Sequence, residues 1–154
     1  MKVVYSCYGG AHSSRAAAAI HLGLLPADRA PRPRDLLSIP RFDDVGAGDM
    51  GILDFMGSDV QGHEVYVLGR GAAREVAERA LKSGFALAGG SPDEILFVDT
   101  LAEVNLIMRV GGFLSRRLGW VALGRPLAAY GTAKAFPRLV RLVEEVKRKL
   151  PARA

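Results

Sequence analysis

The sequence predicts an α/β fold, a three-layer sandwich with a mainly parallel sheet of about four strands and helices on both faces. Short β-branched and aromatic runs alternate with longer segments of helical periodicity, the pattern of parallel strands joined by crossover helices. The chain has 154 residues, 49% hydrophobic and 24% charged, which suits one domain with a sizeable core. We therefore expect residues 1–154 to form a single domain, with right-handed crossovers placing helices on both sheet faces.

The first predicted unit is a strand, a glycine-rich turn and a helix. Residues 2–6 (Lys-Val-Val-Tyr-Ser) have the composition of a buried strand. From Arg15 onward, alanine and leucine predict a helix that ends near Gly23 or Pro26. Residues 7–14 (Cys-Tyr-Gly-Gly-Ala-His-Ser-Ser) form the turn between them. Its glycines permit a tight bend, and we expect Ser13 or Ser14 to cap the helix.

Residues 26–63 are predicted to form an irregular insertion. Proline and arginine are frequent in its first half, and glycines punctuate its acidic second half. Residues 35–64 carry seven acidic residues and one arginine. Short helical turns are expected over residues 36–39 and 52–56. A loop of this length in a compact domain suggests a binding flap, but the sequence leaves the role of the acidic segment 43–64 open.

The second half predicts three more strands, at residues 64–68, 94–98 and 120–123, and helices over 72–82, 101–118 and from about 132 to 150. Helix 101–118 is apolar on nearly every side, so we expect it in the core or against a second copy or a partner protein. Gly111 and Gly112 in its interior indicate close backbone packing or a break between two shorter helices.

The turn at residues 7–14 is a predicted anion site. Unpaired N–H groups and the positive end of the helix face this loop, and such sites most often hold phosphate. The residues expected to bind it are Tyr8, Gly9, Gly10, Ala11, His12, Ser13 and Ser14. The helix N-terminus favours the thiolate of Cys7, and His12 can carry a proton. Cys7 and His12 are therefore the candidate catalytic residues.

Three further residues are candidates for a supporting role. Ligands of open parallel sheets bind beyond the carboxyl ends of the strands, where Arg70 and Asp99 both follow predicted strands. Arg70 could add a guanidinium to the phosphate site, although a tight turn at Gly69-Arg70-Gly71 is the preferred interpretation. Asp99 could act as an acid, although the preferred interpretation is that it orders the next helix start. Arg15 lies inside the first helix.

The spacing Cys-x-x-Gly-x-x-Ser-Ser at residues 7–14 resembles the phosphocysteine loop of the B components of sugar phosphotransferase systems. It is also similar to the phosphate loop of low-molecular-weight protein tyrosine phosphatases, where strand, Cys, loop, Ser and helix follow in the same order. Both resemblances imply that Cys7 is a nucleophile or phosphoryl carrier. Where the phosphatases have their phosphate-binding arginine this chain has Ser13, which argues against tyrosine-phosphatase activity.

A second resemblance covers nearly the whole chain. It is carried by residues 7–14, by the following Ala-Ala-Ala-Ile-His-Leu-Gly-Leu-Leu-Pro, by Phe42-Asp43 and by the run from Gly62 to Gly69. On these residues the chain resembles a family of small proteins from spore-forming Firmicutes, described only as a domain of unknown function. The resemblance implies a bacterial, cytoplasmic setting.

Composition limits the function further. A single cysteine excludes an internal disulfide and a multi-cysteine zinc site and fits a reducing compartment; no metal or other cofactor is required. No signal peptide is evident and no apolar run reaches the ~20 residues of a membrane span, so we expect a soluble cytoplasmic protein. Residues 125–154 carry eight basic and two acidic residues. Without interleaved aromatics they predict a solvated helix face rather than a nucleic-acid site.

Two functional hypotheses follow. In the first, the protein binds a phosphate-containing ligand at residues 7–14, such as a phosphorylated metabolite or nucleotide, and Cys7 carries out phosphoryl chemistry. In the second, it is a non-catalytic regulatory or partner-binding subunit of a bacterial, sporulation-associated complex, and Cys7 is a small core residue. Helix 101–118 would then be the contact with a partner or a second copy.

Overall fold

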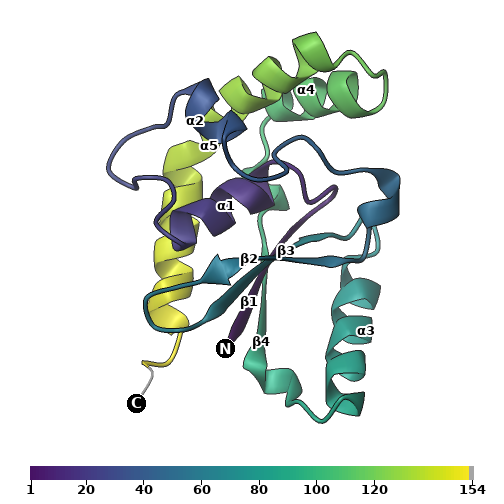
Figure 1. Cartoon of the computed structure of the whole chain (residues 1–154), viewed down its shortest axis with the longest axis vertical. Coiled ribbons are helices and arrows are strands. Elements are labelled where there is room, and N and C mark those ends of the chain that lie inside the picture. Colours follow the sequence, from purple (N-terminus) through teal and green to yellow (C-terminus); the bar gives the residue numbers. More distant parts are fainter. Residues whose placement is uncertain (153–154) are drawn as a thin grey trace.

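The computed structural model describes residues 1–152 and has an α/β architecture (Figure 1). Its strands are β1 (Lys2–Cys7), β2 (Leu53–Ser58), β3 (Glu64–Gly69) and β4 (Ile95–Asp99). The α-helices are α1 (Ser13–His21), α2 (Pro33–Leu37), α3 (Arg74–Leu87), α4 (Leu106–Arg116) and α5 (Val121–Lys149). Short 3-10 helices are η1 (Ala47–Asp49), η2 (Pro92–Glu94) and η3 (Leu101–Glu103).

The four strands form one mixed sheet in the order β2-β3-β1-β4. The central strand β1 is parallel to both neighbours, and its register pairs Cys7 with Gly69 and Ser6 with Asp99. β2 is antiparallel to β3. The predicted α/β class and four strands are confirmed. Because β1, β3 and β4 run in the same direction, their carboxyl ends meet at one edge of the sheet.

The fourth strand is not where the sequence predicted it. Residues 120–123 lie at the beginning of α5, whereas most of residues 52–56, expected as a helical turn, belong to β2. The β2 sequence, Leu-Asp-Phe-Met-Gly-Ser, has no β-branched residue, so its strand propensity is weak. Pairing with β3 decides its conformation, including a bulge between Phe55 and Gly57.

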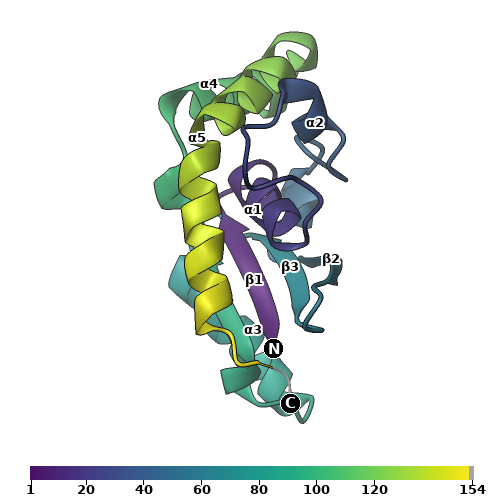
Figure 2. The ribbon, with the colours of Figure 1, turned by 90° about the vertical axis from the view of Figure 1, so that its left-hand side faces the viewer.

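The two faces of the sheet contribute to separate cores. One core joins the sheet to α1 and α5 (Figure 2), and its members from β1 and β3 are Val3, Tyr5, Val65 and Val67. The opposite face packs on α3 through Val4, Leu68, Leu81 and Phe85. All nine residues of α1 are buried, whereas no residue of α3 is. The helix that follows residues 7–12 is therefore held on all sides.

The predicted helix 101–118 is divided. Residues 101–103 form η3, and α4 begins only after Asn105, whose side chain accepts the Met108 N–H at 2.9 Å. This cap ends one segment and starts the next. The exposed face of α4 carries Leu106 and Phe113, which are 72% and 54% exposed. Of the two expected environments, burial in the core of this chain is therefore wrong for α4, and contact with a partner or a second copy stays a prediction.

α4 and α5 pack backbone to backbone. An ideal Cβ on Gly111 would lie 2.4 Å from the Ala128 nitrogen, and one on Gly124 would lie 2.3 Å from the Ser115 nitrogen. The close packing predicted at Gly111 is confirmed. α5 continues through Pro126 and Pro137, where the sequence indicated a loop and a later helix start, because this packing outweighs local helix propensity.

The insertion packs its apolar residues beside α1 and reaches the 7–12 loop. Leu36, Ile39 and Phe42 are buried in the core that joins α1 to α5. Next to Phe42, the Asp43 N–H donates to the Ala11 carbonyl at 3.1 Å. The insertion therefore brings an acidic residue to the end of β1.

Candidate functional site

The loop after β1 lies against the end of β3. An ideal Cβ on Gly10 would lie 2.8 Å from the Gly69 nitrogen, and one on Gly69 would lie 2.8 Å from the Gly9 oxygen. Gly10 also has a φ of +67°, a conformation that other residues rarely adopt. Close contact and positive φ together explain the glycine at position 10.

Cys7 lies at the base of this loop, with 5% of its surface exposed. Its Sγ accepts the Gly10 N–H at 3.1 Å and lies 3.2 Å from the Ser14 Oγ. Both groups can donate a hydrogen bond to sulfur. The loop therefore places two possible donors within reach of the Cys7 sulfur.

Most N–H groups of the loop have no acceptor. Its carbonyls are occupied, since Cys7 accepts from Arg70, Tyr8 from Gly71 and Ala11 from Asp43, at 2.9–3.1 Å. Within residues 1–152, however, no hydrogen-bond acceptor is found for the N–H groups of Tyr8, Gly9, Ala11, His12, Ser13 and Ser14. These donors surround the N-terminus of α1 and are available to a ligand with several acceptor oxygens.

The two serines do not cap α1, so that expectation is wrong. His12 occupies the N-cap position and makes no side-chain capping bond. Ser13 Oγ lies 2.9 Å from Thr100 Oγ1, and Ser14 Oγ faces Cys7. Long-range partners therefore replace the local capping bonds that the sequence suggested.

His12 is held by a carboxylate from the insertion. Its Nε2 lies 2.7 Å from Asp43 Oδ1, and its ring packs edge-on against Phe42 at 5.3 Å between centroids. Asp43 also accepts a hydrogen bond from Ser115 Oγ of α4 and lies 3.5 Å from Arg125 Nε of α5. Three segments distant in sequence thus fix the imidazole beside the loop.

The Asp43 side chain is fully buried. Burial by itself would raise its pKa, but the hydrogen bonds from His12 and Ser115 favour the charged form and leave the pKa below its usual value. The charged carboxylate therefore orients the imidazole of His12. Sequence reasoning missed this role of Asp43, although it identified the dipeptide Phe42-Asp43, because the contact depends on the path of the insertion.

The three supporting candidates lie in different environments. Arg15 is 1% exposed and donates to the Pro40 carbonyl at 3.0 Å and to Asp54 at 2.5 Å, so it binds the insertion. Arg70 and Asp99 form an ion pair at 2.8 Å at the carboxyl edge of the sheet. Asp99 also pairs with Arg74 and accepts the Leu101 N–H at 2.8 Å, which agrees with its expected role at the next helix start.

The space between the loop and the insertion is small. A cavity of about 10 Å³ is lined by Gly10, Arg15, Asp54 and neighbouring residues, and a volume of this size holds about one water molecule. A ligand larger than water has to approach the loop from elsewhere.

The approach from α4 brings an arginine to the loop that sequence reasoning missed. An ideal Cβ on Gly9 would lie 2.2 Å from Arg116 Nη1, so the guanidinium covers this glycine. Arg116 is the last residue of α4. The contact could not be seen in the sequence because it depends on how the α4–α5 pair packs over the loop.

A model of the family described as a protein of unknown function, DUF3189, matches residues 2–148. The chain belongs to this family. The full-length resemblance found in the sequence is thereby confirmed at the level of an uncharacterised family. No curated protein and no solved structure matches the chain.

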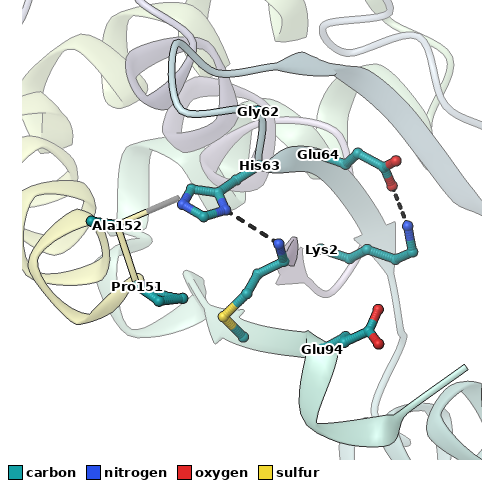
Figure 3. Close-up of a pocket in the computed structure, with 8 residues that line it drawn as sticks. Lys2, Gly62, His63, Glu64, Glu94, Pro151 and Ala152 are labelled. Atoms are coloured by element: carbon teal, nitrogen blue, oxygen red, sulfur yellow. Dashed lines mark hydrogen bonds and ion pairs between the residues drawn. The ribbon is translucent and has the colours of Figure 1, made fainter. Parts of the chain in front are cut away.

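This DUF3189 member has a second, larger cavity at the opposite edge of the sheet (Figure 3). Its volume is about 420 Å³, and its lining comprises Met1, Lys2, Gly62, His63, Glu64, Glu94, Pro151 and Ala152. Figure 3 shows that polar groups here face one another: Lys2 pairs with Glu64, and the Met1 amine lies 3.2 Å from His63 Nδ1. No residue predicted for the site lies in this cavity.

Across residues 1–152, no three His, Cys, Asp or Glu side chains are grouped so that they could hold a metal ion. Nor does any helix in that range combine the length and apolarity needed to span a bilayer.

Proposed function

We propose that this is a small bacterial, cytoplasmic protein that binds a phosphate-containing ligand at residues 7–14, and that Cys7 can take part in phosphoryl chemistry there. The proposal retains the predicted three-layer sandwich, with helices on both faces of the sheet and the carboxyl edge of β1 left to the ligand. A phosphorylated metabolite or nucleotide is the class of ligand that such a loop recognises.

One observation carries the proposal. Cys7 Sγ, which accepts the Gly10 N–H at 3.1 Å, lies at the base of a loop in which six other N–H groups have no acceptor within residues 1–152. A tetrahedral anion with several oxygens satisfies such donors better than a single water does. The positive end of α1 adds to the attraction.

The same arrangement supports phosphoryl transfer. The Cys7 thiolate would form an S–P bond as the P–O bond to the leaving group breaks, and the leaving oxygen would take a proton from protonated His12. Asp43 orients that imidazole at 2.7 Å. Water would then attack the phosphocysteine and give a proton to the now neutral His12 as the S–P bond breaks, releasing inorganic phosphate and regenerating the Cys7 thiolate and protonated His12.

A second function is favoured by a different surface. Large apolar side chains are exposed along α4 and the start of α5, among them Leu106, Phe113, Trp120 and Leu123 at 54–72%. Exposed apolar groups of this size are typical of protein contacts. A regulatory or partner-binding subunit, or a homodimer, would use this surface and would need no reaction at Cys7.

Calorimetric titration and thermal unfolding in inorganic phosphate test the binding proposal. Phosphate should stabilise the protein by about 2.7 kcal/mol at 100 times its Kd, while chloride at equal ionic strength should not. Absence of both heat and stabilisation would contradict the proposal. A phosphocysteine adduct in wild type but not in Cys7→Ser, seen by mass spectrometry after incubation with phosphorylated compounds, would establish the chemistry.

A further inference from the structure

One residue of α4, Arg116, covers the loop that contains Cys7. An ideal Cβ at Gly9 would lie 2.2 Å from Arg116 Nη1, 3.1 Å from its Cζ and 3.2 Å from its Nη2. All three distances are short, so the planar guanidinium lies directly against the glycine. A side chain at position 9 would displace the guanidinium from this position.

Arg116 differs from the other arginines around the site. Arg15 pairs with Asp54, Arg70 with Asp99 and Arg125 with Asp43. Within the part of the chain that the structure describes, Arg116 alone of these four has no carboxylate partner. Its buried Nε has no hydrogen-bond acceptor, a feature that it shares with Arg15 and Arg70. A partly buried cation without a partner is unfavourable unless an anion joins it.

The neighbouring residue on α4 also serves the site. Ser115 Oγ donates to Asp43, which holds His12. Consecutive residues of α4 therefore contact the two sides of the loop, Ser115 through Asp43 and Arg116 through Gly9. The backbone packing of Gly111 and Gly124 between α4 and α5 holds this helix in place.

We infer that Arg116 is the guanidinium ligand of a phosphoryl dianion held in the 7–14 loop. This inference rests on the proposed function. Arg116 brings this guanidinium to the loop from α4. The guanidinium fork binds two oxygens of a phosphoryl group while the loop N–H groups bind the others. Phosphate monoesters and inorganic phosphate share this chemistry.

Titration calorimetry of the full chain with inorganic phosphate tests the inference. We expect Arg116→Ala to raise the Kd about 10- to 100-fold, the effect of losing a charge-assisted hydrogen-bond pair. Arg116→Lys should recover only part of the affinity because it keeps the charge but not the fork. Arg117→Ala, the matched control at the exposed residue that follows α4, should bind as wild type does. Phosphoserine in place of inorganic phosphate distinguishes an ester ligand from the free anion.

A second variant tests the inference independently, in case Arg116→Ala does not fold. Gly9→Ala keeps every charge, but its Cβ takes the position of Nη1 and displaces the guanidinium. It should weaken phosphate binding while thermal unfolding shows a folded protein. If wild type binds phosphate and these variants bind it equally well, the inference is wrong and the loop site stands without Arg116. If wild type binds no phosphate, the proposed function itself fails.

Discussion

The chain contains two units of strand, glycine-containing turn and helix in different environments. β1, residues 8–12 and α1 form the first, and β3, Gly69-Arg70-Gly71 and α3 form the second. In the second turn, the N–H groups of Arg70 and Gly71 donate to the Cys7 and Tyr8 carbonyls. In the first, most N–H groups remain unpaired. The second turn therefore supports the first through these two hydrogen bonds.

The largest effect is expected in the free energy of unfolding, when a glycine of the first turn and a glycine of the second turn are each replaced by alanine. Gly10 and Gly71 both have positive φ, +67° and +57°, but only Gly10 would place a Cβ against backbone, 2.8 Å from the Gly69 nitrogen. Gly71→Ala should lower the free energy of unfolding by about 1–2 kcal/mol through left-handed strain. Gly10→Ala should lower it by about 2–5 kcal/mol because overpacking adds to that strain. Urea unfolding measures both, and equal losses would mean that the two turns are not distinguished by packing.

Removing the arginine of the second turn should affect stability more than binding. Arg70 is 8% exposed and pairs with Asp99 at 2.8 Å. Arg70→Ala should lower the free energy of unfolding by about 1.5–3 kcal/mol. Asp99 keeps its contact with Arg74, so the phosphate Kd should change far less than in Arg116→Ala. Calorimetry compares the two variants, and a comparable loss of affinity would assign Arg70 to the site.

Reactivity of the single thiol reports on the first turn directly. Phosphate bound above Cys7 should block alkylation, so iodoacetamide labelling should be about tenfold slower at a phosphate concentration ten times the Kd. Mass spectrometry follows the labelled fraction over time. Arg70→Ala should leave this protection intact, whereas Arg116→Ala should remove it at the same concentration. If phosphate does not slow the labelling of Cys7, the anion binds away from this residue.

The smallest expected effect is a change in how the free energy of unfolding depends on pH when the contact between Asp43 and the loop is altered. The pKa of Asp43 is lower in the folded chain than its usual value, about 3.9 in an unfolded chain. In this pH range the native state therefore binds fewer protons than the unfolded state. The contribution of Asp43 to the free energy of unfolding is complete above its unfolded pKa and is lost as the pH falls through its folded pKa. In Asp43→Asn, stability should fall less steeply than in wild type between about pH 5 and pH 3. Denaturation at constant ionic strength measures the slopes, and parallel curves would exclude a contribution from Asp43.

Sequence reasoning succeeded where local pattern was sufficient. The strands at residues 2–6, 64–68 and 94–98 and the turn that contains Cys7 follow from short-range composition, and each is present in the structure. It failed for β2, whose residues adopt a strand only when paired with β3, and for α5, which continues through Pro126 and Pro137 because α4 packs on it. It also assigned capping to Ser13 and Ser14, which contact Thr100 and Cys7 instead.

The sequence by itself determined that a cysteine and two glycines follow a buried strand and precede a helix, because strand composition, glycine freedom and helix propensity are properties of neighbouring residues. Only the tertiary structure decided what surrounds that turn. Asp43, Ser115 and Arg116 reach it from the insertion and from α4. Their convergence depends on helix packing and sheet register over long sequence separations, which no local pattern encodes.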